Sequence, residues 1–232
     1  MIKNIHQSFV SASTEKRKLL AILIDPDVFD NSKAEHFLNK LPLDTTHLFV
    51  GGSTVEKDKT ETTVSFLNKY SPLPIVLFPG NESQITNKAD ALLFLSLISG
   101  RNPEYLIGQQ IKAVSKLRGD TLEVISTGYI LIDGGNKSAV ERVTGTAPMS
   151  QNNTQAIVNT ALAGEYLGKK LIYLEAGSGA KFPVNTNVIS AVKKAIKIPL
   201  LVGGGIKSEE QKQEAFKAGA DMVVMGTFFE NK

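Results

Sequence analysis

Eight short runs of aliphatic and β-branched residues recur along the chain, and this repeat constrains the fold more than any other feature. In order they read KLLAILIDPD, HLFVGGS, PIVLFPG, ALLFLSLISG, LEVISTGYILI, KLIYLEAGSG, IPLLVGGGI and ADMVVMGT. Each run is almost continuously apolar, as expected for a strand of a parallel sheet that is covered on both faces. Stretches between them, such as TETTVSFLNKY, VISAVKKAI and SEEQKQEAFKAG, have helical length and an amphipathic pattern. The sequence therefore predicts a repeated strand–helix unit.

Eight such units in 232 residues predict an α/β protein with a single (β/α)8 TIM-barrel domain over residues 1–232. A doubly wound open sheet is the alternative, but the count of eight and the glycine-rich turns after the seventh and eighth strands favour the barrel. After Gly226 the chain continues as TFFENK, so we expect a modified or missing last helix, with the segment from Asn4 to Arg17 covering the gap. The stretch Asp133 to Ser150 exceeds an ordinary βα loop, which is typical of functional loops.

Composition and charge exclude several classes of protein. The 26 Lys and Arg against 23 Asp and Glu give a formal charge of +3, spread along the chain, which argues against a nucleic-acid partner. The absence of cysteine excludes disulfide and thiolate chemistry. The polar N-terminus is unlike a secretory signal, and no apolar run approaches the roughly 20 residues of a membrane span. We therefore expect a soluble, cytoplasmic protein.

The turns after the seventh and eighth strands form a candidate anion site. Gly203 to Gly205 precede IKSEEQ, in which Ser208 and Gln211 match a helix capping box. Exposed amide N–H groups at such a turn, backed by a helix N-terminus, favour a phosphate. Three glycines alone more often make a tight turn, but this position in a barrel favours the phosphate interpretation. Gly226 and Thr227 would complete the cradle.

Two aspartates flank a proline at the end of the first strand. Asp25 and Asp27 fit simple turn chemistry around Pro26. They equally fit a hard-cation site, in which an aspartate and the Ser53 hydroxyl from the next strand hold magnesium together with a phosphate. Spacing leaves both interpretations open.

A carboxylate and a tyrosine end the sixth strand, in YLEAGSG. Glu175 would be ionised at neutral pH unless strongly buried, and is placed to accept a proton from a nearby hydroxyl. Tyr173 lies on the same side of the strand and would bond the same substrate. A structural ion pair between Glu175 and a barrel lysine is the alternative.

The motifs LIDPD, GGS, YLEAGSG, LLVGGGI and MGT, in this order and spacing, resemble those of the geranylgeranylglyceryl phosphate synthase family. The resemblance runs from about Leu19 to Gly226, and YLEAGSG together with VGGGI is its specific part. Leu23 stands where some bacterial relatives have a lysine, so the chain resembles the branch with the longer LIDPD motif.

This resemblance implies a TIM-barrel prenyltransferase that joins sn-glycerol 1-phosphate, through its 3-hydroxyl, to a polyprenyl diphosphate. The products are an ether-linked prenylglyceryl phosphate and diphosphate, with Mg²⁺ as cofactor and geranylgeranyl diphosphate as the expected donor, although the tail length stays open. Asp25 and Ser53 look like the metal positions, Glu175 like the catalytic base, and Tyr173 like the residue that steadies the glycerol. The implied substrate-binding positions are Tyr173, Leu174, Glu175, Ala176, Gly177, Ser178, Gly179, Gly204, Gly205, Gly226 and Thr227.

A prenyl tail needs an apolar channel, for which the third to fifth strands offer Val76, Phe78, Leu93, Leu95 and Leu97, with Tyr129 at the mouth. The resemblance also implies a homo-oligomer, and we expect peripheral contact with a membrane on product release. Two other functions stay open: a phosphate-binding isomerase, epimerase or lyase, and a barrel that binds a phosphorylated lipid precursor without turnover.

Overall fold

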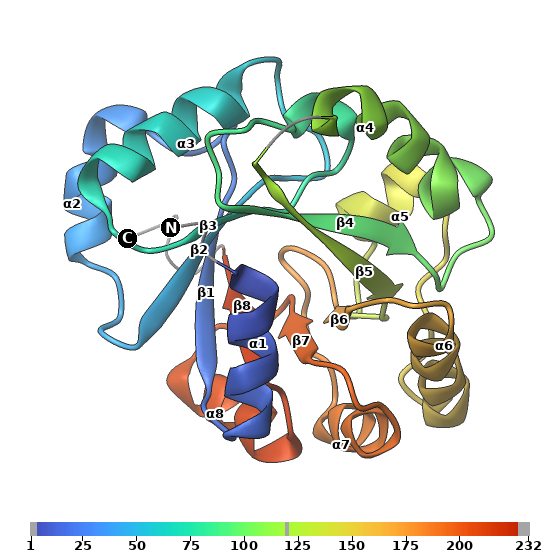
Figure 1. Cartoon of the computed structure of the whole chain (residues 1–232). Helices are drawn as coiled ribbons and strands as arrows, with labels where there is room; N and C mark the ends of the chain where they lie inside the picture. Colours follow the sequence, from blue (N-terminus) through green and yellow to red (C-terminus); the bar gives the residue numbers. More distant parts are fainter. Residues whose placement is uncertain (1–3, 119–120, 227–232) are drawn as a thin grey trace.

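Eight parallel strands pair in the order of the sequence, and β8 returns to β1 to close a barrel (Figure 1). This computed structural model describes residues 4–118 and 121–226. The strands β1 to β8 span Leu19–Ile24, Thr45–Val50, Ile75–Leu77, Ala91–Leu97, Glu123–Leu131, Leu171–Glu175, Leu200–Gly203 and Met222–Met225. They coincide with the eight apolar runs, so the predicted barrel is confirmed and the open sheet is excluded.

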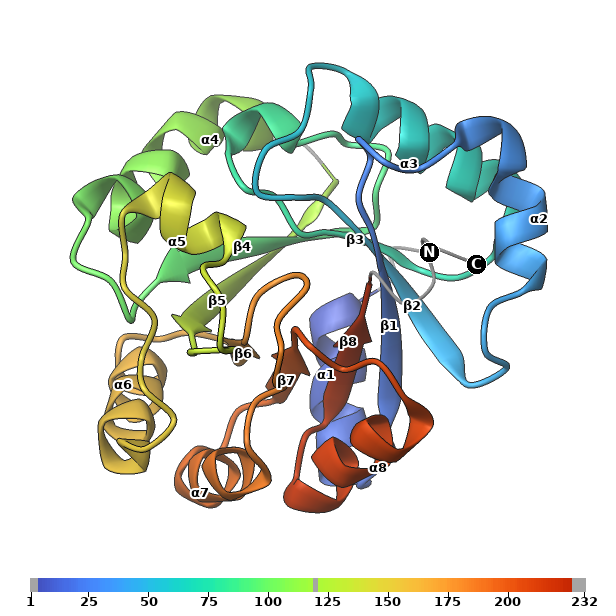
Figure 2. The ribbon, with the colours of Figure 1, turned by 180° about the vertical axis from the view of Figure 1, so that it is seen from behind.

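Helices between successive strands cover the outside of the barrel (Figures 1 and 2). Their bounds are Ala34–Asn39 (α2), Lys59–Tyr70 (α3), Gln109–Leu117 (α4), Thr154–Tyr166 (α6), Thr186–Ala195 (α7) and Glu209–Ala218 (α8). Two begin with a different turn: the 3₁₀ turn Asn31–Lys33 precedes α2, and a π-helical turn, Glu104–Gly108, precedes α4.

The connection after β3 departs from the eightfold repeat. The described chain has a 3₁₀ turn, Glu82–Gln84, between β3 and β4 in place of an α-helix. The sequence there has no amphipathic stretch of helical length, which explains the difference.

The core has two layers because side chains alternate between the faces of each strand. One layer fills the barrel interior and includes Phe49, Leu93 and Tyr173. The other lies between the strands and the outer helices and includes Leu48 and Leu174. Residues of each strand that face the interior therefore also line the two ends of the barrel.

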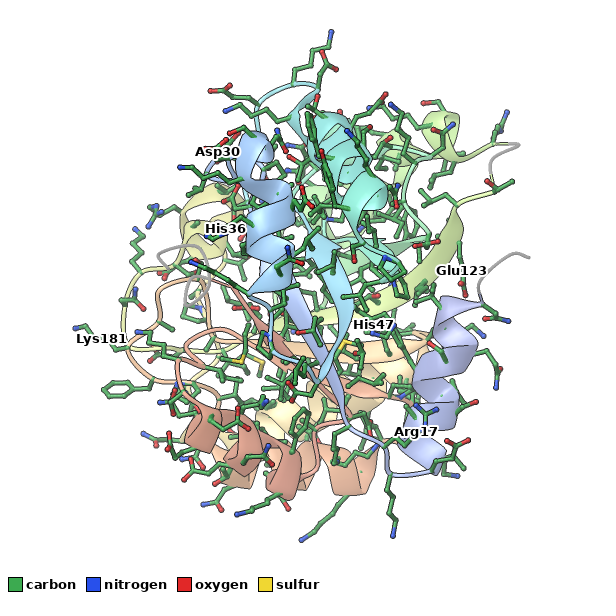
Figure 3. All side chains as sticks on the ribbon, turned by 90° about the vertical axis from the view of Figure 1, so that its left-hand side faces the viewer. Arg17, Asp30, His36, His47, Glu123 and Lys181 are labelled. Carbon is green, nitrogen blue, oxygen red and sulfur yellow. The ribbon has the colours of Figure 1, made fainter. Side chains whose placement is uncertain are left out.

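The N-terminal helix α1, Ile5–Thr14, closes the N-terminal end of the barrel. Its buried residues Ile5, Phe9 and Ala12 pack against the interior layer, and Glu123 at the start of β5 accepts hydrogen bonds from the Ile5 and His6 N–H groups at 2.6 and 3.1 Å (Figure 3). The expectation that this segment replaces an outer last helix was therefore wrong, because its apolar face covers the open end of the barrel. The residues after Gly226 lie outside the described residues.

A short helix, α5 (Ala139–Thr144), lies within the long connection after β5. Figures 1 and 2 show α1 and α5 at opposite ends of the barrel, so α5 lies over the C-terminal ends of the strands. In the part of the chain described here, no helix is both long and apolar enough to cross a membrane.

Candidate active site

The C-terminal ends of the strands open into a cavity of about 320 Å³. Glycine turns that follow β6 and β7 line one part of it, and apolar side chains from β4, α4, α5 and the turn after β3 line another. Tyr173 and Glu175 lie in the same cavity, as do Asp25 and Ser53 from the ends of β1 and β2. The fold thus brings the predicted base, glycerol contact, metal positions and much of the predicted cradle to one place.

Glu175, the last residue of β6, is buried, with 6% of its surface exposed. Its Oε1 accepts a hydrogen bond from the Gly177 N–H at 2.7 Å. Burial raises the pKa of Glu175 to about 7, although the Gly177 N–H and the nearby Tyr173 hydroxyl act to lower it. A carboxyl group with a pKa near neutrality is suited to exchange a proton with substrate, and no lysine pairs with it among the described residues.

Tyr173 is fully buried, and its hydroxyl lies beside the Glu175 carboxylate without the geometry of a good hydrogen bond. Burial also raises the pKa of Tyr173 well above its ordinary value, so the hydroxyl stays protonated at neutral pH. Buried hydroxyl groups normally have a partner. This one lines the cavity, so a ligand oxygen is the partner we expect.

An aromatic cluster supports these two side chains. The strand register pairs Tyr173 with Tyr129 on β5, and their rings stack with centroids 5.6 Å apart and an interplanar angle of 16°. The Phe78 ring stacks on Tyr173 at 5.1 Å. The cluster fixes the Tyr173 ring and places aromatic faces where the cradle meets the apolar part of the cavity.

Glycines make the space that Glu175 and Tyr173 occupy. The register places Gly203 opposite Glu175, and a Cβ added to Gly203 would lie 2.2 Å from the Tyr173 hydroxyl oxygen. Gly204 has a φ of +79°, and its added Cβ would lie 2.3 Å from the Glu175 Oε1 and 2.5 Å from the Gly177 amide nitrogen. Contact therefore excludes a side chain at Gly203, and both backbone conformation and contact exclude one at Gly204.

The predicted anion cradle is formed by loops rather than by a helix end. Its cavity-lining members in the described chain are Gly177, Ser178, Gly179, Gly204, Gly205 and Gly226, whereas Thr227 lies outside the described residues. Ser208 caps α8 by accepting from the Gln211 N–H at 3.2 Å. However, Glu209 and Glu210 occupy the first turn of α8, so their charges oppose the attraction of that helix end for an anion. The loop amides are therefore better candidates for anion contacts than the start of α8.

The two aspartates of the first turn have separate roles. Asp27 is exposed, forms an ion pair with Lys59 at 3.3 Å and does not line the cavity. Asp25 lines it, accepts a hydrogen bond from the Asp27 N–H at 2.9 Å and lies against Gly52. Burial raises the pKa of Asp25 above its ordinary value. The turn interpretation therefore fits both residues, and the cation interpretation fits Asp25 alone.

Some predicted positions lie outside the cavity. Leu174 and Ala176 face the outer core layer, so their side chains are not available to a substrate. Val76 is fully buried in the barrel interior and does not line the cavity. The strand alternation already indicated this for Leu174, which is one residue from the inward-facing Tyr173 and Glu175.

The apolar part of the cavity is longer than predicted. Phe78, Leu93, Leu95, Leu97 and Tyr129 line it as expected, and further apolar lining comes from Ile85, Leu92, Phe94, Tyr105, Ala113, Val140 and Val143. The last two belong to α5, which sequence reasoning missed as a helix. The spacing of Ser138 and Glu141 is a capping signal, and the Ser138 Oγ accepts from the Glu141 N–H at 3.0 Å. Lys207 also lines the cavity, and sequence reasoning missed it because a single lysine after a glycine turn carries no motif of its own.

Comparisons with known proteins agree with the motifs. The sequence model of the PcrB family matches residues 12–232. Geranylgeranylglyceryl phosphate synthase of Zunongwangia profunda is 56% identical over 227 residues, covering 98% of this chain and 97% of that protein. The synthase of the same name from Flavobacterium johnsoniae is 51% identical over 232 residues, covering 100% and 96%.

A solved structure is similar throughout. It is (S)-3-O-geranylgeranylglyceryl phosphate synthase from Thermoplasma acidophilum in complex with the substrate sn-glycerol-1-phosphate. The TM-score is 0.90 at 31% identity, covering 98% of this chain and 92% of that one. These matches confirm the resemblance inferred from the motifs.

Proposed function

Because the chain belongs to the PcrB family, we propose that it is a prenyltransferase that joins sn-glycerol 1-phosphate to a polyprenyl diphosphate. The 3-hydroxyl of the glycerol attacks the first carbon of the prenyl chain, and the bond from that carbon to the diphosphate oxygen breaks. The products are an ether-linked prenylglyceryl phosphate and diphosphate. Geranylgeranyl diphosphate is the donor we expect, given the names of the relatives.

The observation that carries this proposal is the position of Glu175 in one cavity with a glycine-rich cradle and a long apolar lining. The cradle suits the phosphate, and the apolar lining from β4, α4, α5 and the turn after β3 suits a prenyl tail. A small sugar phosphate or amino-acid precursor would leave most of that apolar surface without a partner. Prenyl transfer is therefore favoured over isomerisation or lysis.

The protein residues supply binding, orientation and proton transfer. Glu175, with a pKa of about 7, accepts the proton of the 3-hydroxyl as that oxygen attacks, because an alcohol is a poor nucleophile without a base. The Tyr173 hydroxyl donates a hydrogen bond to a glycerol oxygen and so holds the alcohol beside Glu175. The loop amides hold the phosphate at the far end of the glycerol.

The leaving diphosphate needs positive charge. Asp25 and Ser53 offer two oxygen donors from neighbouring strand ends. The described residues contain no group of three or more Asp, Glu, His or Cys side chains that could hold a metal without substrate. That set fits Mg²⁺, which is commonly held by one or two protein oxygens and completed by substrate phosphates and water. Bound there, the ion would neutralise charge that develops on the diphosphate.

Replacing Asp25 by asparagine tests the metal position. We expect the Mg²⁺ concentration for half-maximal activity to rise by roughly tenfold or more, because the amide removes the charged ligand but keeps its shape. Titration of MgCl₂ in the transferase assay measures this, with Asp27→Asn as the matched control because Asp27 does not line the cavity. An unchanged magnesium titration for Asp25→Asn would place the metal elsewhere.

The proposed reaction is tested directly by incubating the purified protein with Mg²⁺, radiolabelled sn-glycerol 1-phosphate and prenyl diphosphates of increasing length. We expect label to move into an organic-extractable product, and the panel reads out the preferred tail. Omission of the prenyl diphosphate is the control. Binding of sn-glycerol 1-phosphate without product from any donor would favour a barrel that binds its ligand without turnover. Homo-oligomerisation, membrane contact and cytoplasmic location stay predictions.

A further inference from the structure

The cavity is unfavourably charged for the substrate that we propose. Its acidic residues in the described chain are Asp25, Glu82 and Glu175, against one basic residue, Lys207. A phosphate monoester carries nearly two negative charges at neutral pH. Its arrival close to Glu175 therefore brings like charges together in a partly enclosed space, where they repel more strongly than in water. The Mg²⁺ proposed at Asp25 and Ser53 would serve the diphosphate, so another group must offset the repulsion at the phosphate of the glycerol substrate.

The loop amides meet part of this need, because backbone N–H dipoles attract an anion. The end of α8 contributes little, since Glu209 and Glu210 occupy its first turn. A full positive charge therefore has one source among the described residues that line the cavity, the Lys207 ammonium.

Lys207 follows the glycine turn of β7 by two residues and is held at the cradle. Its Nζ donates a hydrogen bond to the Ala180 carbonyl oxygen at 2.8 Å, at the end of the loop that contains Gly177 to Gly179. Its backbone N–H donates to the Gln211 Oε1 at 2.7 Å, which holds the residue at the start of α8. The ammonium thus bridges the two loops that line the phosphate end of the cavity, and no other described residue accepts a hydrogen bond from its two remaining N–H groups.

On the premise of the proposed function, we infer that Lys207 is the cation that recognises the phosphate of the glycerol substrate. It determines affinity for the phosphoryl group rather than the rate of the chemical step, because the phosphate does not change charge during prenyl transfer. A contact that is equal in the ground state and in the transition state lowers KM and leaves kcat unchanged.

Substitution of Lys207 by glutamine tests this role. We expect KM for sn-glycerol 1-phosphate to rise roughly tenfold or more, as for the loss of a charge-assisted hydrogen bond, with kcat within about twofold of wild type. The inhibition constant of inorganic phosphate, as a competitor of sn-glycerol 1-phosphate, should rise by a similar factor. Lys207→Arg should return both KM and the phosphate inhibition constant close to their wild-type values, because it keeps the charge.

Lys181→Gln is the matched control. Lys181 lies on the same loop as Ala180, extends into solvent and does not line the cavity (Figure 3). The Lys181→Gln substitution removes the same charge from the chain as Lys207→Gln does. Because Lys181 lies outside the cavity, the substitution should leave KM and the phosphate inhibition constant unchanged. Equal values for Lys207→Gln and Lys181→Gln would overturn the proposal, and so would a fall in kcat without a change in KM.

Two further measurements distinguish phosphate recognition by Lys207 from a purely structural role. If Lys207 only holds the loops together, Lys207→Gln will lower the melting temperature and Lys207→Arg will not restore phosphate inhibition. That pair of results would also contradict the proposal. Calorimetric titration with inorganic phosphate needs no turnover. It therefore tests Lys207 even if the wild-type protein forms no prenyl product: a weaker phosphate affinity in Lys207→Gln than in Lys181→Gln supports the role, and equal affinities overturn it.

Discussion

Replacing Glu175 by glutamine is expected to lower kcat by about 100-fold or more while KM for sn-glycerol 1-phosphate stays within a few fold of wild type. The amide keeps the shape, and its oxygen still accepts the Gly177 N–H bond, which is 2.7 Å long in the wild-type structure. It cannot accept the substrate proton, and general bases contribute roughly 100- to 10,000-fold to rates. Steady-state kinetics with labelled sn-glycerol 1-phosphate measure both constants.

The pH dependence provides a second measurement on the same residue. Because burial raises the pKa of Glu175 to about 7, the base form is lost as the pH falls through that value. For the wild-type protein, kcat/KM should therefore decline tenfold per pH unit below about 7, since this ratio reports the free enzyme. Residual activity of Glu175→Gln should lack that decline.

Glu82→Gln is the control for Glu175→Gln, because Glu82 lines the same cavity and the substitution removes the same charge. We expect its kcat to remain within about twofold of wild type. The Glu175 variant should also fold, because an uncharged amide avoids the burial of a carboxylate charge at pH 8. Wild-type turnover by Glu175→Gln would assign the base to another residue.

Replacing Gly204 by alanine is expected to raise KM for sn-glycerol 1-phosphate by roughly 100-fold or more. The new Cβ would lie 2.3 Å from the Glu175 Oε1, 2.5 Å from the Gly177 nitrogen and 2.7 Å from the Ala176 nitrogen. Two of these atoms are backbone, so no side-chain rotation relieves the contact and the cradle must move. A displacement of about 1 Å at such a site can cost on the order of 100-fold in rate, and loss of phosphate contacts made equally in the ground and transition states appears as a higher KM.

A second glycine separates the contact from the backbone strain. Gly168, in the turn between α6 and β6, has a φ of +82°, close to that of Gly204, but an added Cβ there meets nothing within 4 Å. Gly168→Ala should therefore reduce the free energy of unfolding by roughly 1 to 3 kcal/mol through backbone strain, which a lower melting temperature will show. It should leave KM unchanged. If Gly204→Ala and Gly168→Ala had equal KM values, Gly204 would have no special part in the cradle.

The fold was predictable because its signal is repeated. Each apolar run is ambiguous alone, but eight of them alternating with amphipathic segments leave few arrangements in which every strand is covered on both faces. That Asp25, Glu175 and Gly204 line one cavity was predictable for a related reason. The C-terminal ends of parallel strands meet on one face of a barrel, so residues far apart in sequence meet once the strands are identified.

The position of α1 was predicted wrongly for a physical reason. The amphipathic pattern of a helix indicates that one of its faces is buried, but it does not indicate which apolar surface covers that face. The interior layer left open at the N-terminal end of the barrel and the outer faces of the strands are both apolar. The choice between them depends on contacts such as that of Glu123 with the start of α1, which link residues more than 100 positions apart.

The sequence by itself determined the barrel, the strand ends that carry the acids and the glycine turns, because these follow from local periodicity and from strand order. The tertiary structure decided the properties that depend on distant neighbours. It placed Glu175 opposite Gly203 and beside the stacked tyrosines, and the resulting burial raises its pKa to about 7. It also held Lys207 against Ala180, 27 residues away. The charge, burial and hydrogen bonding of a side chain depend on all the residues around it in space. Most of those residues are distant in sequence, so a local pattern along the chain cannot determine these properties.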